Sequence, residues 1–426
     1  MTGVSYMPNV SVLVLNYNGK QHLKPCLDSL FHLDYPRERL EIVVADNGSR
    51  DGSQELLRRE FPSVRLVEHG RNLGVSGGNN AASAAVDSEY VAFLNNDTRV
   101  EPDWLSQMVK ALAPDQGLIA VGSKILRWDG RRIDYVGPRL SFHGAASQVD
   151  FGSPEVEKYR QVMPILAPCG GSMLIERQTF LEVGGFDQDF FAYFEDIDLG
   201  WRLWVMGYQV ALAPRAITYH RQHGSWGQRA MEIRRRVLYE RNSLYSIIKN
   251  YEEQNLQRIL PVALLLTAKR ALLYTHLDLA PYRPPGVEPP VRETEATLAP
   301  QLAQETTLSA RLRRSWREGG FKGAATKILG RLSTTVLTRI AQGLPWVDTE
   351  LVSKTAICHL VALDDVAENM DKMLAKRACI QAARRRPDAE IVPLFQEPFW
   401  PVYKDVEYLR TVARLAHDLG IETIFE

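Results

Sequence analysis

The segment Phe191–Arg202 holds three carboxylates within four residues, Glu195, Asp196 and Asp198. Apolar and aromatic residues precede these acids, and a pattern typical of a helix follows them. Taking an ionised carboxylate out of water costs several kcal/mol, so aromatic surroundings can prepare such a group to act as a general base. Acids are also common at helix starts, where they interact with free N–H groups and the helix dipole. The cluster alone predicts either a catalytic base or an ordinary helix start.

Three apolar runs are typical of buried strands, and polar residues follow each of them directly. The runs are 10–15, 42–45 and 90–94, and the polar residues are Asn16 and Asn18, then Asp46, then Asn95, Asn96 and Asp97. In sheets of mostly parallel strands, ligands bind at the carboxyl ends of the strands. We therefore expect binding or catalytic residues at these positions. An Asp there can accept a hydrogen bond from the ring N–H of uracil or thymine, although Asp, Asn, Gly and Ser also form ordinary turns.

A glycine-rich segment, 72–80, opens the helix that follows it. Small residues let backbone N–H groups approach a ribose or a phosphate. The segment is neither a GxGxxG motif nor a P-loop, so its specificity for nucleotides is low by itself.

Asp97 and His220 are the candidate ligands for a divalent cation, Mg²⁺ or Mn²⁺. Carboxylate oxygen suits either ion, and the ion would bridge diphosphate oxygens. Asn95 stands where a DxD motif has its first acid, so Asp97 alone supplies charge. A lone histidine is more often structural than a metal ligand. A metal site that lacks one carboxylate needs another ligand, however, and this favours His220 as that ligand.

Strands alternating with helices over the first half of the chain predict an α/β fold with a mostly parallel sheet. We divide the chain into four parts on this pattern: a catalytic domain, two amphipathic helices that pack on it or on a membrane surface, a linker with six prolines, and a helical C-terminal region. Their bounds are 1–225, 226–280, 281–300 and 301–426.

The net charge is zero but unevenly distributed, with 19 Lys and Arg against 10 Asp and Glu in residues 226–346. This basic segment suggests contact with an anionic surface. The four cysteines form no CxxC pair, which fits a reduced interior of the cell. No secretory signal and no run of 18 apolar residues is evident, so we expect a cytoplasmic protein, peripheral on the inner face of the membrane.

The ordered set of motifs resembles the inverting family 2 glycosyltransferases with a GT-A fold, and among them the rhamnosyltransferase-like members that decorate bacterial surface polysaccharides. The resemblance covers residues 9–225. Its motifs are Val10–Gly19, Asp46–Ser53, Asn72–Asn80, Leu94–Asp97, Gly170–Ser172, Gly184–Asp187, Phe191–Arg202 and Tyr219–His220.

The resemblance implies a role for each matching residue. Asp196 would be the catalytic base, beside Glu195. The donor, a nucleoside-diphosphate sugar carrying dTDP or UDP, would be bound by Asn16, Asn18, Asp46, Asn72, Gly78, Asn96 and Gly171. Asp97 and His220 would hold the metal. The acceptor would be a saccharide or a lipid-linked saccharide.

Two rival functions remain open. A nucleotidyltransferase that forms sugar nucleotides would usually carry a Gly-rich, Arg-containing loop after the first strand, where this chain has Asn16–Gly19. A non-catalytic module would bind the donor without needing Asp196. A dehydrogenase is disfavoured because no GxGxxG follows the first strand.

The C-terminal half predicts helices at 228–250, 261–280, 302–342, 364–386 and 404–419. For the first of these helices, packing on the catalytic domain or on a second copy of the chain is favoured over contact with a membrane surface. For 302–342, membrane contact and an intersubunit helix are equally favoured. No motif for nucleic-acid recognition accompanies the basic residues.

Overall fold

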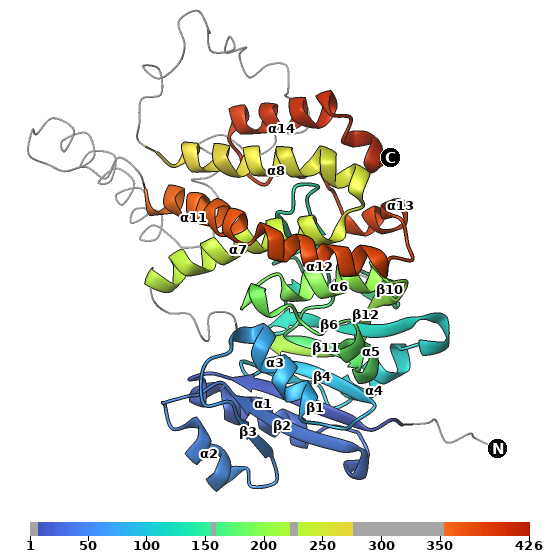
Figure 1. Cartoon of the computed structure of the whole chain (residues 1–426). Coiled ribbons are helices and arrows are strands. Elements are labelled where there is room, and N and C mark those ends of the chain that lie inside the picture. Colours follow the sequence, from blue (N-terminus) through green and yellow to red (C-terminus); the bar gives the residue numbers. More distant parts are fainter. Residues whose placement is uncertain (1–6, 155–158, 222–228, 276–352) are drawn as a thin grey trace, which may run out of the picture. The chain divides into compact units, whose positions relative to one another are not determined.

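The computed structural model describes residues 7–154, 159–221, 229–275 and 353–426 (Figure 1). The predicted proline-rich linker, 281–300, and the basic helical segment, 302–342, lie outside the described residues. Nearly all described residues belong to one compact unit, which comprises residues up to Leu273 together with Lys354–Glu426.

The first half of the chain alternates strands and helices as predicted. The strands are β1 (Val10–Asn16), β2 (Leu40–Asp46), β3 (Arg65–Glu68), β4 (Tyr90–Asn95), β5 (Thr98–Val100), β6 (Leu118–Arg127), β7 (Ile133–Tyr135), β8 (Pro138–Leu140), β9 (Ala146–Gln148), β10 (Met163–Pro164), β11 (Ser172–Glu176) and β12 (Gln209–His220). The helices between them are α1 (Lys20–Phe31), α2 (Ser53–Glu60), α3 (Gly74–Ala84), α4 (Trp104–Ala111), α5 (Arg177–Glu182) and α6 (Glu195–Val205). Short 3₁₀ turns lie at Arg37–Arg39, Pro114–Gln116 and Gln188–Phe190.

The main sheet has ten strands, with β10-β12-β6-β11-β4-β1-β2-β3 as its central order. Strands β3, β2, β1 and β4 pair in parallel, and so do β6 and β12. Strand β11 is antiparallel to both β4 and β6, so these two neighbours run in the same direction. The carboxyl ends of β1, β2 and β4 therefore meet the start of β11 at one edge of the sheet. The α/β class with a mostly parallel sheet is confirmed.

Both faces of the sheet are buried, as parallel sheets require. Alternate residues of β1 belong to different cores: Val12 and Val14 pack with α1 and α4 residues, whereas Leu13 packs with Phe93 and Phe180 on the other side. The last strand, β12, includes the apolar residues 210–213 and continues past Pro214 to His220. A register shift between Ala213 and Ile217 admits the proline, which cannot donate a ladder hydrogen bond.

Beyond β12, the described residues form mainly helices, which Figure 1 shows stacked on the side of the sheet domain where α6 lies. They are α7 (Arg229–Asn250), α8 (Glu253–Leu273), α11 (Lys354–Glu368), α12 (Met370–Ala382), α13 (Asp388–Ile391) and α14 (Val406–Asp418), with 3₁₀ turns at Val392–Phe395 and Glu422–Ile424. Helix α7 contacts α6, α8, α11 and α12. The apolar residues of α8, including Ile259, Val262 and Leu266, are buried in this packing. None of the described helices combines the length and apolar character that a membrane span needs.

A buried charge network joins α7 to α6. The Lys249 ammonium donates to Asp187 at 2.6 Å and lies 2.9 Å from Asp198. Asp198 also accepts from Arg202, at 2.9 Å, and from Asn250, at 3.0 Å. Each buried charge therefore has an opposite charge in contact, which offsets its desolvation.

Replacing Lys249 by Met should destabilise the protein by about 3–5 kcal/mol, because the change leaves buried carboxylates with fewer counter-charges. Urea unfolding followed by circular dichroism measures this loss. Lys372→Met is the matched control, since Lys372 pairs with Asp189 from a side chain that is 55% exposed. The control should lose no more than about 1 kcal/mol. Equal losses in the two variants would contradict the assignment of the network as a buried support.

Candidate active site

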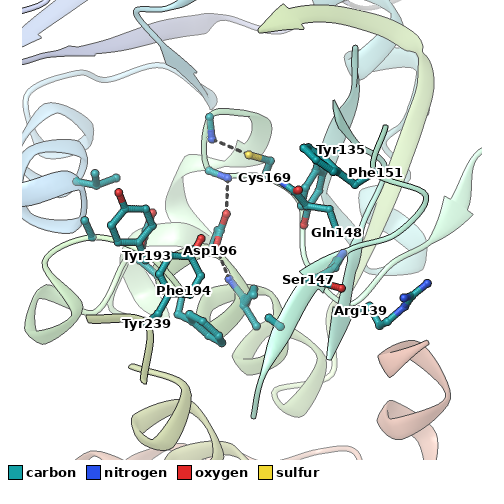
Figure 2. Close-up of a pocket in the computed structure, with 18 of the residues that line it drawn as sticks. Tyr135, Arg139, Ser147, Gln148, Phe151, Cys169, Tyr193, Phe194, Asp196 and Tyr239 are labelled. Atoms are coloured by element: carbon teal, nitrogen blue, oxygen red, sulfur yellow. Dashed lines mark hydrogen bonds between the residues drawn. The ribbon is translucent and has the colours of Figure 1, made fainter. Parts of the chain in front are cut away.

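Asp196 lies in the first turn of α6 and faces a cavity of about 770 Å³. Its carboxylate accepts hydrogen bonds from the backbone N–H groups of Gly170, at 3.0 Å, and Ile197, at 2.8 Å. These bonds fix the side chain while leaving it partly exposed. Figure 2 shows Asp196 between an aromatic group, Tyr193, Phe194 and Tyr239, and residues from the opposite wall.

The opposite wall of the cavity is the two-stranded hairpin β8–β9 and the turn that follows it. This wall supplies Arg139, Ser147, Gln148 and Phe151. Arg139 is the only Lys or Arg side chain in the described lining, and it also pairs with Glu397 at 3.3 Å. A surface of tyrosine, phenylalanine and small polar groups suits a neutral ligand with hydroxyls and an apolar face.

Glu195 is more buried than its neighbour, with 7% of its surface exposed, and its Oε2 atom has no hydrogen-bond partner. Burial and then the charge of Asp196 raise the pKa of Glu195 to about 8. Burial also raises the pKa of Asp196, but hydrogen bonds from Gly170 and Ile197 oppose that rise. The pair therefore favours a proton on Glu195 and the negative charge on Asp196.

Asp198, the third acid of the cluster, is fully buried and points into the charge network with Arg202 and Lys249. The sequence allowed the cluster to be an ordinary helix start, and Asp198 does lie in the first turn of α6. Its charge is compensated by two cations, Arg202 one turn further along α6 and Lys249 on α7. The contact with Lys249 could not be predicted, because the two residues are far apart in the sequence. Asp198 anchors α6 to α7.

The polar residues at the ends of β1, β2 and β4 form one hydrogen-bonded cluster. Asn16 donates to Asp46 at 2.9 Å and to Ser49 at 3.1 Å, and it accepts from Asn96 at 2.7 Å. Asp46 is fully buried and also accepts from Gln54 and from the N–H groups of Gly48 and Ser49. Burial would raise the pKa of Asp46, but these hydrogen bonds outweigh it and lower the pKa. In this structure Asp46 holds its own loop together.

The remaining predicted donor residues differ in what surrounds them. Asn18 is exposed and accepts from the N–H of Arg50 at 2.8 Å, and Asn72 is exposed at the start of α3. Gly78 is buried, and a Cβ there would lie 2.6 Å from Leu15 and 2.8 Å from Asn47. Gly78 is thus required for close packing of α3 on β1. Gly171 lines the cavity.

Asp97 and His220 are brought together, with the histidine Nε2 3.4 Å from the Asp97 carboxylate. A third residue, Asp134 on β7, accepts from His220 Nδ1 at 2.5 Å, an arrangement that orients metal-binding histidines. Burial lowers the pKa of His220, but Asp134 and Asp97 outweigh it and raise the pKa to about 10. The positive charge that the two carboxylates stabilise here is that of the imidazolium, so a metal ion bound by His220 would have to replace the proton on Nε2.

Among the described residues, no group of three or more His, Cys, Asp and Glu side chains is arranged to hold a metal by itself. Asp97 and His220 could therefore hold a divalent ion only with oxygens from a ligand or water completing its coordination. Asp134 was missed by sequence reasoning, because a single acid in a short strand carries no distinguishing pattern.

Comparisons with known proteins identify the family of the chain. Residues 11–181 match the model of "Glycosyl transferase family 2", and residues 148–239 match that of "Glycosyltransferase like family 2". The chain belongs to the family 2 glycosyltransferases. The predicted GT-A fold class is likewise confirmed. Both family models end before the last turns of α7, so the C-terminal helices lie outside the matched region.

Two bacterial relatives illustrate the family. The N-acetylglucosaminyl-diphospho-decaprenol L-rhamnosyltransferase of Mycobacterium tuberculosis is 28% identical over 50% of this chain and 76% of the relative. The O-antigen biosynthesis protein RfbC of Myxococcus xanthus is 28% identical over 51% of this chain and 18% of the relative.

Among solved structures, GalNAc-T7 with UDP, GalNAc and Mn²⁺ superposes with a TM-score of 0.49 at 15% identity, over 65% of this glycosyltransferase and 53% of that chain. The mannosyltransferase PcManGT from Pyrobaculum calidifontis, in complex with GDP-Man and Mn²⁺, gives a TM-score of 0.45 at 20% identity, over 85% and 87% of the two chains.

The raised pKa of Glu195 makes the stability of this glycosyltransferase depend on pH. In the folded state Glu195 keeps its proton up to a pKa of about 8, whereas in the unfolded chain it ionises near 4.5. Burial of Glu195 therefore begins to lower the free energy of unfolding as the pH rises above 4.5, and above about pH 8 this loss no longer increases. Glu195→Gln should be more stable relative to wild type at pH 8.5 than at pH 4.5. The difference should exceed about 1 kcal/mol, since one pKa unit corresponds to about 1.4 kcal/mol.

Chemical denaturation of the two proteins across this pH range measures the effect. The exposed Glu55→Gln on α2 is the control, and it should follow wild type at every pH. A constant difference between Glu195→Gln and wild type from pH 4.5 to 8.5 would show that Glu195 ionises normally in the folded protein.

Proposed function

We propose that this glycosyltransferase moves a sugar, with inversion, from a nucleoside-diphosphate donor to a saccharide or lipid-linked acceptor in bacterial surface polysaccharide synthesis. The donor would be dTDP-rhamnose or a UDP-sugar, and a divalent cation, Mg²⁺ or Mn²⁺, would be required. The observation that carries this proposal is Asp196, a fixed and partly exposed carboxylate at the wall of a large cavity within a family 2 domain.

Asp196 would act as the general base. It would take the proton of an acceptor hydroxyl while that oxygen forms a bond to the anomeric carbon of the donor sugar. The bond from that carbon to the diphosphate breaks on the opposite face, which inverts the configuration. A proton kept on Glu195 would leave Asp196 as the single negative charge of the pair, free to receive the acceptor proton.

Asp97 and His220 would hold the divalent cation, and Asp134 would orient the imidazole. When bound, such an ion offsets the negative charge that develops on the leaving diphosphate. The support for this assignment is the pairing of a carboxylate and an oriented imidazole at the ends of β4 and β12.

The donor-binding residues divide into two groups in this proposal. Asn18 and Asn72 are exposed and Gly171, although buried, lines the cavity, and these three residues would contact the donor directly. Asn16, Asp46 and Asn96 are bonded to one another and would shape the loops on which the nucleotide lies. Gly78 would act through the close packing of α3.

The cavity beside Asp196 would receive the acceptor. Its aromatic wall suits the apolar face of a sugar ring, and its polar residues suit hydroxyls. A lipid-linked acceptor is supported by the relative whose name includes diphospho-decaprenol. We also propose that the protein works in the cytoplasm at the inner face of the membrane, where such an acceptor would be reached.

Asp196→Asn should reduce sugar transfer by about 10²–10⁴-fold, the usual contribution of a general base, while leaving donor affinity unchanged. A panel of dTDP-, UDP- and GDP-sugars, with Mg²⁺ or Mn²⁺ and candidate acceptors, identifies the donor through release of the nucleoside diphosphate. Calorimetry with that donor then gives its affinity for each protein. Asp115→Asn, an exposed acid in the turn before β6, is the control and should retain full turnover.

The outcomes separate the rival functions. Donor binding without release by wild type would indicate a binding module, and pyrophosphate release from a nucleoside triphosphate with a sugar phosphate would indicate a nucleotidyltransferase. Near-normal turnover by Asp196→Asn would remove Asp196 from the role of base.

Membrane contact would come from the basic segment, residues 226–346. In the described part of this segment, Arg234 and Arg235 on α7 are exposed. The full chain should float with vesicles that contain anionic phosphatidylglycerol at low salt, and 0.5 M NaCl should release it because salt screens surface charges. Neutral phosphatidylcholine vesicles serve as the control. Failure to float with anionic vesicles at low salt would contradict the proposed contact.

A further inference from the structure

The backbone that leads into α6 is held in an unusual conformation. Phe191, Tyr193 and Phe194 have φ values of 62°, 67° and 68°, in the left-handed region that side chains with a Cβ rarely adopt. Such conformations persist only where the surroundings enforce them. Glu195 and Asp196 follow immediately, so the direction of both carboxyl groups depends on this turn.

A single buried side chain on α7 contacts this turn at three points. The Asn242 amide lies 3.0 Å from the carbonyl oxygen of Phe190, 2.9 Å from that of Ala192 and 2.8 Å from that of Tyr193. The amide has two hydrogens, so three acceptors share two donors. Asn242 is fully buried, which leaves no water to replace it.

The other side of the turn is held by α3. The carbonyl of Phe191 accepts from the N–H of Val75, at 2.6 Å, and from that of Ser76, at 3.3 Å. The turn is therefore fixed between the first residues of α3 and the middle of α7. The α3 contact is made by backbone atoms, whereas α7 contacts the turn through side chains, which mutation can remove without altering the backbone. Besides Asn242, the Arg241 guanidinium donates to the carbonyl oxygen of Phe190 at 3.4 Å, but it does not reach those of Ala192 and Tyr193.

The turn and α7 are also joined by ring contacts. Tyr239, one turn before Asn242, packs on Tyr193 with ring centroids 4.8 Å apart and on Phe194 at 5.7 Å. These three rings line the cavity together with Asp196. A shift of the turn would thus move the aromatic wall and the carboxylate as one unit.

We propose that Asn242 is a positioning residue, which holds the 190–194 turn so that Asp196 faces the acceptor hydroxyl. Its effect on turnover rests on the proposed role of Asp196, whereas its effect on the turn does not. Asn242 lies beyond both matched family models, so the C-terminal helices contribute directly to the geometry of the active site.

Two variants remove the amide: Asn242→Leu, which keeps most of the side-chain volume, and Asn242→Ala. Ser246→Ala is the matched control, because Ser246 is equally buried on α7 but its hydroxyl bonds only to the carbonyl of Asn242 within the helix. Hydrogen exchange measured by mass spectrometry on peptides that cover 190–199 reports the turn directly. Donor affinity, kcat and KM report its consequence for the reaction.

Both Asn242 variants should exchange faster over 190–199 than wild type, and Ser246→Ala should not. Their kcat should fall by about 100-fold, the cost of misplacing a reacting group by about 1 Å, with donor affinity within threefold of wild type. Unchanged exchange over 190–199 in a folded Asn242→Leu would overturn the clamp. Faster exchange with unchanged kcat would overturn the positioning role. A wild-type protein that turns over no sugar nucleotide would instead refute the proposed function, and the exchange result would still decide the clamp.

Discussion

The proposed catalytic carboxylates, Glu195 and Asp196, depend on one constraint, the reversal of the backbone between the 3₁₀ turn Gln188–Phe190 and α6. Three residues with side chains adopt left-handed conformations there, and each costs of order 1–3 kcal/mol. Contacts from outside the turn must supply that free energy. The N-terminus of α3 and the Asn242 amide provide these contacts, and each comes from a different half of the chain. The strained turn is thus one place, beside the charge network around Lys249, where the sheet domain and the C-terminal helices are joined.

The C-terminal helices also determine which acids near the turn are paired with cations. The acids near the turn fall into a group that is neutralised and a group that is not. Asp187 and Asp198 contact Lys249, and Asp187 and Asp189 also pair with Lys376. The cations in these contacts come from α7 and α12. Glu195 and Asp196 have no Lys or Arg among their ion pairs in the described part of the chain, so burial raises both of their pKa values. Arg139 is the only Lys or Arg in the described lining of the cavity, and the paired cations contact Asp187, Asp189 and Asp198 instead. In the proposed mechanism this distribution of charge would keep Asp196 basic enough to accept a proton.

The sequence was sufficient for the parts of this structure that local patterns determine. Apolar runs predicted the strands, and polar residues at their ends predicted that Asn16, Asp46 and Asn96 would lie together, as they do. The roles of those residues were harder to predict, because hydrogen-bond partners such as Gln54 satisfy Asp46 only once the loop is folded. Asp134 and Asn242 carried no recognisable signal. Each acts through a residue that is distant in sequence, His220 or Ala192, and such pairs become visible only in three dimensions.

A general base needs a fixed direction and an unsatisfied charge, and these two demands conflict. Cations near Asp196 would hold it firmly but would lower its pKa and its affinity for a proton. Here the direction is fixed by uncharged groups: two backbone N–H donors on the carboxylate itself and one amide on the turn before it. Neutral donors orient a carboxylate at a smaller cost in basicity than a lysine or arginine would impose. The charged donor next to Asn242, Arg241, contacts the carbonyl oxygens of Asp189 and Phe190 at the start of the turn, whereas the neutral amide of Asn242 contacts that of Tyr193, closer in sequence to Asp196.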